Sequence, residues 1–197
     1  MLTTWVKQLT KLEDLHWRSF PKNTLQAIQS LRNCYEEGQT CSFSSLAQKT
    51  AYWLFWFPRQ VQILKSFLDL ASHNLQFPIF DYGIGGAPGA FLYPGDSWYG
   101  FDLDLTLANS ANQILNHPVK FCKPQELFQT VFPKTILMLM SYGEIQASFT
   151  FIQHGLERGS TFIVIEPGTK IHSHAMMELR DHFYKFVEFT KGYDYYI

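Results

Sequence analysis

The sequence of 197 residues predicts an α/β protein, in which a doubly wound, mainly parallel sheet follows an N-terminal helical extension. Short, nearly continuous apolar runs alternate with helix-like stretches along the second part of the chain, which is typical of parallel strands covered by helices on both faces. In the first part of the chain, apolar residues recur at the three- to five-residue spacing of helices, and no strand is predicted there. We therefore predict a helical region over residues 1–75 and an α/β domain over residues 76–197.

The first part predicts three helices. Apolar side chains recur every three to five residues in the first helix, at Trp5, Leu9, Leu12 and Trp17. A second helix is expected after a cap at Asn23 or Thr24, and a third is expected to start at Ser44 or Ser45. Pro58 is expected to kink or restart the third helix, because proline has no N–H to donate inside a helix.

The second part predicts alternating strands and helices, and right-handed crossovers leave few arrangements of the strands in one sheet. The predicted strands are Pro78–Tyr82, Trp98–Leu103, Val119–Cys122, Lys134–Met140 and Thr161–Ile165. The helix-like stretches that follow them are Leu105–Leu115, Pro124–Phe128, Ile145–Leu156 and His172–Tyr184.

The first predicted strand runs into a glycine-rich turn, which spans residues 80–90 and reads FDYGIGGAPGA. Such a turn lets a ligand approach the main chain closely, and it lies at the usual ligand crevice of an open α/β sheet. A second acid, Asp102, follows the next strand 21 residues after Asp81, where a carboxylate binds the ribose hydroxyls of a nucleotide-like cofactor. The predicted cofactor site comprises Asp81, Gly83, Gly85, Gly86, Asp102 and Leu103.

The charge of this turn favours a cationic cofactor. A dinucleotide needs its pyrophosphate at a helix N-terminus through full G-x-G-x-x-G spacing, but Pro88 stands where the helix opens. Asp81 would also add negative charge beside the phosphates. S-adenosylmethionine carries an ammonium, a sulfonium and no phosphate, so electrostatics favour it over the cofactor of a nicotinamide-dependent dehydrogenase.

Four segments, at residues 51–58, 80–89, 141–145 and 165–169, resemble the methyltransferase-like family associated with the small ribosomal subunit of mitochondria and bacteria. The resemblance runs from about Ala51 to Arg180, and the EPGT element at residues 166–169 is its most distinctive piece. It implies a Rossmann-like class I S-adenosylmethionine-dependent methyltransferase fold, a role in small-subunit assembly and translation, and that subunit or its RNA as partner.

The sequence departs from that family in three ways. The glycine loop is two residues longer than the usual GxGPG form, and the helix after it is cut short at Pro94-Gly95. The family also commonly continues into a cysteine-bearing region thought to hold an iron–sulfur or zinc centre, whereas this chain ends at Ile197. We therefore expect an α/β domain that is C-terminally incomplete relative to the family, and we carry over no metal site.

Ser141, Tyr142 and Glu144 follow the fourth strand, where acceptor-side residues usually lie, and they are the candidates for a catalytic role. Glu144 serves equally well as a cap of the next helix, and no Asn-Pro-Pro-aromatic or Pro-Cys signature of methyl transfer occurs. His172 and His174 are expected to be exposed helix residues. The enzyme assignment therefore stays open beside an alternative, a non-catalytic ribosome assembly or scaffold protein that retains the fold.

Charge separates the two parts of the chain, with a net charge of +4 over residues 1–65 and −5 over the remaining 132 residues. If the partner is RNA, the first part has the positive charge to meet phosphates. The candidate RNA-binding residues are Lys7, Lys11, Arg18, Lys22 and Arg59, and the tryptophans of this part stack on bases or, more commonly at helical spacing, form core.

Composition excludes several classes. Hydrophobic residues make up 46%, which excludes general disorder, and the net charge of −1 excludes binding of nucleic acid by bulk basicity. No apolar run is long enough to span a bilayer, and the start resembles neither a signal peptide nor a transit peptide. Cys34, Cys41 and Cys122 lack the spacing of a disulfide framework or a zinc site, so we expect three buried thiols in a reduced, cytoplasmic protein.

Overall fold

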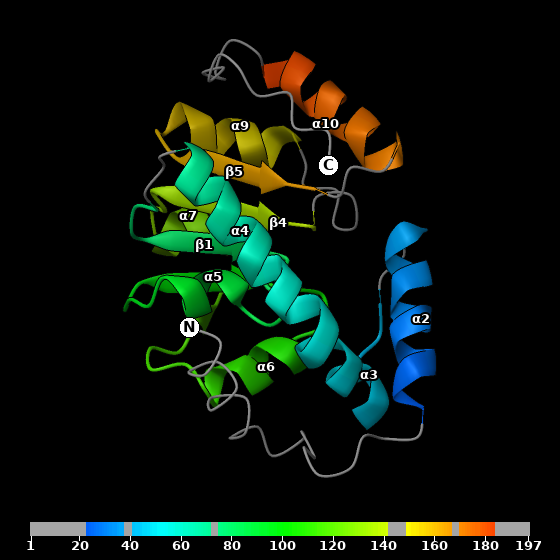
Figure 1. Ribbon diagram of the computed structural model, residues 1–197. Helices are drawn as coiled ribbons and strands as arrows, with labels where there is room; N and C mark the ends of the chain where they lie inside the picture. Colours follow the sequence, from blue (N-terminus) through cyan, green and yellow to red (C-terminus); the bar gives the residue numbers. More distant parts are fainter. Residues whose placement is uncertain (1–22, 38–40, 72–74, 142–148, 167–169, 184–197) are drawn as a thin grey trace.

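The computed structural model describes residues 23–37, 41–71, 75–141, 149–166 and 170–183, and all structural statements concern these residues (Figure 1). Five strands form one all-parallel sheet in the order β3-β2-β1-β4-β5. The strands are β1 (Ile79–Tyr82), β2 (Trp98–Phe101), β3 (Lys120–Phe121), β4 (Thr135–Leu139) and β5 (Thr161–Ile165). This confirms the predicted α/β class and parallel sheet, and the order is Rossmann-like, with its switch point between β1 and β4.

The two central strands are the most apolar. Every residue of β1 and of β4 is buried, as their continuous apolar runs predict for strands covered on both faces. Their side chains alternate between two hydrophobic clusters: Ile79 and Leu137 belong to one, and Phe80 and Ile136 to the other. The sheet therefore separates two cores.

Helices cover both faces of the sheet, so the doubly wound arrangement is confirmed. The first cluster receives side chains from α4 (Phe57–Ala71), α5 (Pro88–Leu92) and α6 (Thr106–Asn112). The second receives them from α7 (Pro124–Thr130), α9 (Phe149–Glu157) and α10 (Lys170–Phe183). In Figure 1, α4 crosses one face of the sheet while α9 and α10 lie on the other side.

The N-terminal part consists of α2 (Thr24–Glu36), α3 (Leu46–Ala51) and a π-helical turn, η1 (Tyr52–Trp56), that continues into α4. Ser45 caps α3: its side chain accepts the N–H of Gln48, and the Gln48 side chain accepts the N–H of Ser45. The π turn directly precedes Pro58, whose ring would clash with the carbonyl four residues earlier in a regular helix. A wider turn relieves that clash, so Pro58 alters the helix where the sequence predicts.

The N-terminal helices share the first core with the sheet. Leu31, Trp53 and Phe57 lie in the same cluster as Trp98 and Leu137, on either side of the predicted boundary at residue 75. Trp53 and Trp56 are buried here and therefore form core, which was the more common expectation for aromatics at helical spacing.

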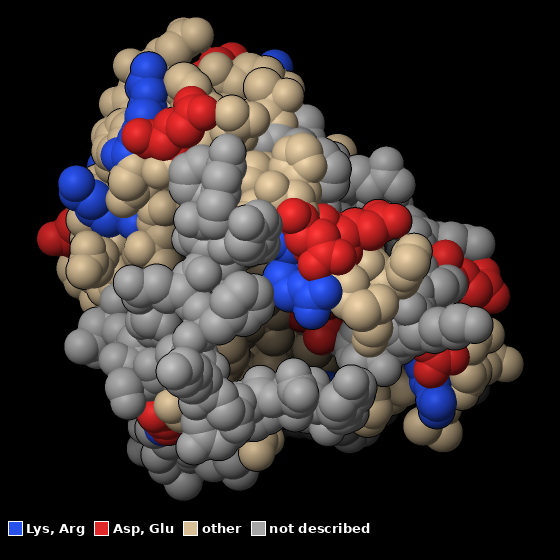
Figure 2. Space-filling model, turned by 90° about the horizontal axis from the view of Figure 1, so that it is seen from above, with Lys and Arg blue, Asp and Glu red and all other residues tan. Residues whose placement is uncertain are grey.

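Charged side chains of the described residues do not gather into one basic patch on the face shown in Figure 2, where Lys and Arg lie beside Asp and Glu. Of the candidate RNA-binding residues, Arg59 is exposed, and its guanidinium lies 5.9 Å from the centre of the Trp56 ring. The other four, Lys7, Lys11, Arg18 and Lys22, lie outside the described residues. In the described part of the chain, no helix is long and apolar enough to cross a membrane.

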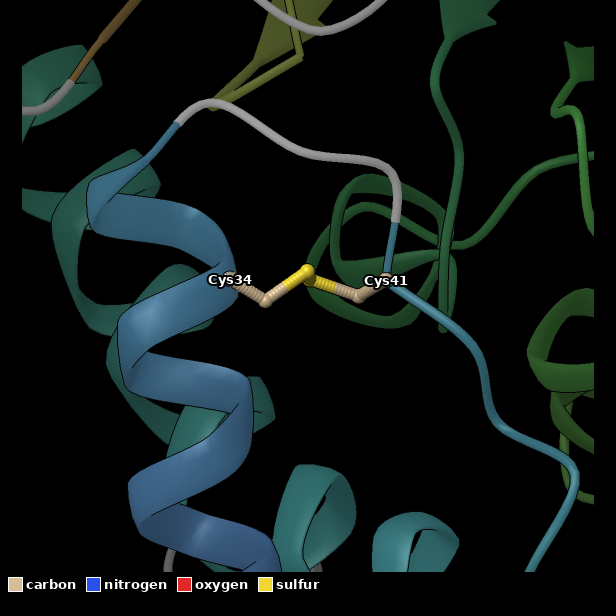
Figure 3. The surroundings of a disulfide bond; sticks show 2 residues. All are labelled: Cys34 and Cys41. Atoms are coloured by element: carbon tan, nitrogen blue, oxygen red, sulfur yellow. A yellow bond between two sulfur atoms is a disulfide. The ribbon is translucent and has the colours of Figure 1, made fainter.

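The expectation of three reduced, buried cysteines is wrong. Cys34, in α2, forms a disulfide with Cys41, whose Cα lies 5.9 Å away, within the range that disulfides span (Figure 3). The two cysteines are only seven residues apart in the sequence. Cys122 is free and half-buried. The spacing of the cysteines in the sequence did not predict this disulfide. No fixed number of residues is characteristic of a bond between a helix and the segment after it.

We predict that removing the disulfide by the double substitution Cys34→Ser and Cys41→Ser lowers the free energy of unfolding by about 2 kcal/mol, since a short closed loop restricts the unfolded chain. Urea unfolding measures this difference, and Cys122→Ser, which removes the free thiol, serves as the control with an unchanged midpoint. Equal unfolding energies of the double variant and the wild type would contradict the prediction.

Candidate functional site

A cavity lies at the carboxyl ends of β1, β2 and β4, where the switch point of the sheet predicts a ligand crevice. Its sheet side is lined by residues that follow these strands and by α6 and β4. These are Gly83, Gly85, Asp102, Leu103, Asp104, Leu107, Leu139, Met140 and Ser141. The N-terminal helices supply the opposite wall, with Tyr35, Cys41, Phe43, Tyr52 and Gln60. Four of the six predicted cofactor residues line the cavity.

The glycine loop between β1 and α5 is held by backbone hydrogen bonds. The N–H groups of Gly83 and Ile84 both donate to the carbonyl of Phe101, at 2.8 and 3.0 Å. Gly83 and Gly85 have φ angles of 79° and 48°, which side-chain-bearing residues rarely adopt. Ile84 is fully buried and anchors the loop in the first core.

The helix after the loop is short. It begins at Pro88 and ends at Leu92, so the predicted early end before Pro94-Gly95 is confirmed. Few N–H groups are free at its start, because Ala87 donates to the carbonyl of Ile84 and proline has no N–H. A helix of five residues that begins with proline is a weak site for a pyrophosphate.

Gly86, which the sequence assigns to the cofactor site, does not line the cavity. It is buried against the N-terminal helices, where its N–H donates to the Tyr52 hydroxyl at 2.9 Å. A Cβ atom added to Gly86 would lie 2.8 Å from the Tyr52 ring and 3.0 Å from the rings of Phe57 and Trp53. This glycine is therefore required by the close approach of the helices.

Asp102 lies directly after β2, as predicted, and lines the cavity. Its Oδ2 accepts the N–H of Gly85 at 2.8 Å, and its Oδ1 accepts the N–H of Asp104 at 3.1 Å. Burial raises the pKa of the Asp102 carboxyl, against the opposing effect of the N–H groups that it accepts. The carboxyl thus faces the cavity and also ties the glycine loop to the end of β2. Leu103 beside it is 60% exposed.

Asp81 lies under the loop, in β1, and is only 1% exposed. Neither of its side-chain oxygens has a hydrogen-bond partner among the described residues. Burial, and then the negative charge of Asp102, raise the pKa of Asp81 to about 8. An unpaired buried acid with a displaced pKa is costly for stability and is typical of functional sites.

The cavity is anionic. Asp102 and Asp104 are its charged lining residues, and no Lys, Arg or His among the described residues lines it. Asp81 beneath the loop adds a third carboxyl close to this wall. Such a set attracts a cation and repels phosphate.

The cavity has a volume of about 50 Å³, which is room for a few water molecules. A nucleoside-sized ligand therefore requires wall residues to move. No group of three or more metal-ligating side chains occurs among the residues that the structure describes.

Of the three candidate catalytic residues, Ser141 is described and lines the cavity. It is buried, and its hydroxyl donates to the carbonyl of Tyr82 at 2.6 Å, which joins the ends of β1 and β4. Tyr142 and Glu144 lie outside the described residues. In the described part of the chain, the only carboxyls that line the cavity are those of Asp102 and Asp104.

The expectation that His172 is exposed is wrong, because it is 5% exposed and lies in the first turn of α10. Its Nε2 is 3.9 Å from a carboxyl oxygen of Glu166, and burial lowers the pKa of the imidazole. His174 is exposed, as predicted. Helical spacing alone did not predict that the start of α10 turns His172 inward.

Tyr52 and Gln60 also line the cavity, although the sequence did not point to them. Tyr52 belongs to the aromatic run before Pro58. This unusual density of aromatic residues next to a proline could have indicated a contact with the site. Gln60 carried no signal, because its approach to the loop depends on how α4 packs on the sheet.

We predict that Asp81→Asn stabilises the protein by about 2 kcal/mol at pH 7, because it removes a buried acid. The folded-state pKa of about 8 lies above the ordinary value of 3.8, so the unfolded chain releases a proton that the folded chain keeps. The difference in unfolding free energy between variant and wild type should therefore grow as pH rises from about 4 to about 8, and then level off.

Urea unfolding at several pH values measures this difference. Asp96→Asn is the matched control, since Asp96 is an exposed carboxylate beside His117, and its substitution should shift stability by less than about 0.5 kcal/mol at any pH. A difference for Asp81→Asn that does not change with pH would contradict the prediction.

In comparisons with known proteins, no protein-family model matches the chain, and no curated protein is significantly similar to it.

Proposed function

We propose that this protein binds S-adenosylmethionine and is a methyltransferase-like protein of class I. The observation that carries the proposal is an anionic, glycine-lined cavity at the switch point of a Rossmann-like sheet, with Asp102 after β2 and Asp81 unpaired beneath the loop. The negative charge of the cavity and Asp81 would attract the cationic end of the cofactor. The carboxylate of Asp102 would accept hydrogen bonds from its ribose hydroxyls.

The charge of the site fits this cofactor better than a dinucleotide. Binding of an ammonium group near Asp81 would favour the ionised carboxyl and supply the partner that it lacks. A pyrophosphate would instead lie against Asp102 and Asp104 with no cationic side chain among the described lining residues. S-adenosylmethionine supplies an electrophilic methyl group when bound, and the protein's part is to position the acceptor and exclude water.

We further propose the small ribosomal subunit or its RNA as the partner, on the resemblance of the four sequence segments. The N-terminal cations are the candidate contacts. Replacing Lys7, Lys11 and Lys22 together with Gln should weaken binding to isolated small-subunit RNA and reduce its salt slope by about 2, measured by fluorescence anisotropy. Binding with an unchanged slope would remove these three residues from the proposed interface.

A non-catalytic assembly protein is the second candidate. The small cavity and the five-residue helix α5 favour it, because a site kept for scaffolding does not need room for a cofactor and an acceptor together. Cofactor binding without methyl transfer to small subunits would support this alternative, whereas transfer of a labelled methyl group would exclude it.

We predict that Asp102→Ala weakens S-adenosylmethionine binding about 10- to 150-fold, the cost of losing hydrogen bonds to a charged group. Titration calorimetry measures the affinity, with NAD as the ligand control and Asp96→Ala, at an exposed carboxylate, as the protein control with unchanged affinity. If the wild type does not bind S-adenosylmethionine, the proposed function fails. If Asp102→Ala binds as tightly as the wild type, the assignment of this carboxyl fails.

A further inference from the structure

We propose that Tyr52, in the N-terminal helical region, is a positioning residue of the ligand site: its hydroxyl fixes the glycine loop in the conformation that accepts the ligand. The inference rests on the proposed function, and it makes the helices before β1 part of the site rather than a separate attachment.

The buried hydroxyl of Tyr52 makes hydrogen bonds to two of the described residues, Gly86 and Gln60. It accepts the N–H of Gly86 at 2.9 Å and donates to Oε1 of Gln60 at 2.8 Å. The Gly86 N–H can only donate and the side-chain carbonyl oxygen of Gln60 can only accept, so the Tyr52 hydroxyl accepts from the first and donates to the second. Tyr52 is 1% exposed and Gly86 is buried, so this N–H depends on an acceptor supplied inside the protein.

The bond falls at the part of the loop that most needs support. Gly85 and Ala87, on either side of Gly86, have φ angles of 48° and 57°. The left-handed conformation is unfavourable for alanine, so the surroundings must hold this segment in place. Asp102 holds the N–H of Gly85 and Tyr52 holds the N–H of Gly86, one from each wall of the cavity.

The packing of Tyr52 leaves its ring little freedom. The ring meets those of Phe43 and Trp53 edge-on, with centres 5.3 and 5.5 Å apart, and Phe57 lies on a further side. The π turn before Pro58 buries Tyr52, Trp53 and Trp56, and the rings of Tyr52, Trp53 and Phe57 lie against Gly86 of the loop. A rigid ring carries its hydroxyl to one place, as a positioning residue requires.

Tyr52→Phe tests the proposal, because it keeps the ring and removes only the hydroxyl. We expect the dissociation constant for S-adenosylhomocysteine, measured by calorimetry at 15 °C, to rise about tenfold. In the ¹⁵N-glycine spectrum the Gly86 amide should shift and exchange with solvent faster. The variant also loses stability, so a control must lose a similar buried hydroxyl elsewhere.

Thr135→Val is that control. The Thr135 hydroxyl, 2% exposed, accepts the N–H of Gln76 and donates to its carbonyl, both at 3.0 Å, at the start of β4 and away from the cavity. This variant should lose comparable stability and bind the ligand as the wild type does. A merely structural role of Tyr52 predicts the same for Tyr52→Phe, and an unchanged affinity would overturn the proposal.

The two proposals fail separately. If the wild type binds neither S-adenosylmethionine nor S-adenosylhomocysteine, the proposed function is overturned, and the glycine spectrum still decides the role of Tyr52. In that case a Gly86 amide that neither shifts nor exchanges faster in Tyr52→Phe overturns the positioning role, while a faster exchange confined to the loop supports it.

Discussion

A buried backbone N–H must find an acceptor inside the protein, and the glycine loop meets this requirement at two successive residues with help from two distant parts of the chain. Asp102, after β2, accepts from Gly85, and Tyr52, from the helices that precede the sheet, accepts from Gly86. Much of the architecture follows from this pairing. The helices must approach closely enough for Gly86 to exclude any side chain, and β2 must end where its first polar residue reaches the loop.

The carboxyls of Asp81 and Asp102 have no cationic partner among the described residues that line the cavity. Buried acids are usually paired. Here Asp81 is buried without a hydrogen bond to any described residue, and both oxygens of Asp102 accept main-chain N–H groups. A buried carboxyl without a partner costs stability, and such groups are common where a protein binds a ligand. Stability and ligand affinity should therefore oppose one another at Asp81, as they commonly do at binding sites.

Much of the fold was predictable from the sequence, because strands buried on both faces leave continuous apolar runs, and β4 lies within its predicted run. The acids at the ends of β1 and β2 were predictable for a similar reason, since a parallel sheet gathers its carboxyl ends at one edge. The disulfide, the burial of His172 and the second wall of the cavity were not. All three depend on where a helix packs. The helical spacing of apolar residues predicts which face of a helix is buried, but it does not predict which element that face contacts.

The outer strand β3 has a consequence for how the molecule behaves in a crowded solution. It pairs with β2 through only two residues, both exposed, and one of them is Lys120, whose ammonium lies over the Tyr99 ring. An open sheet edge invites a strand from another molecule, and short, charged edges are a common protection against such pairing. β3 offers an incoming strand only two residues to pair with, and one of them is charged. This edge of the sheet is therefore a poor template for aggregation.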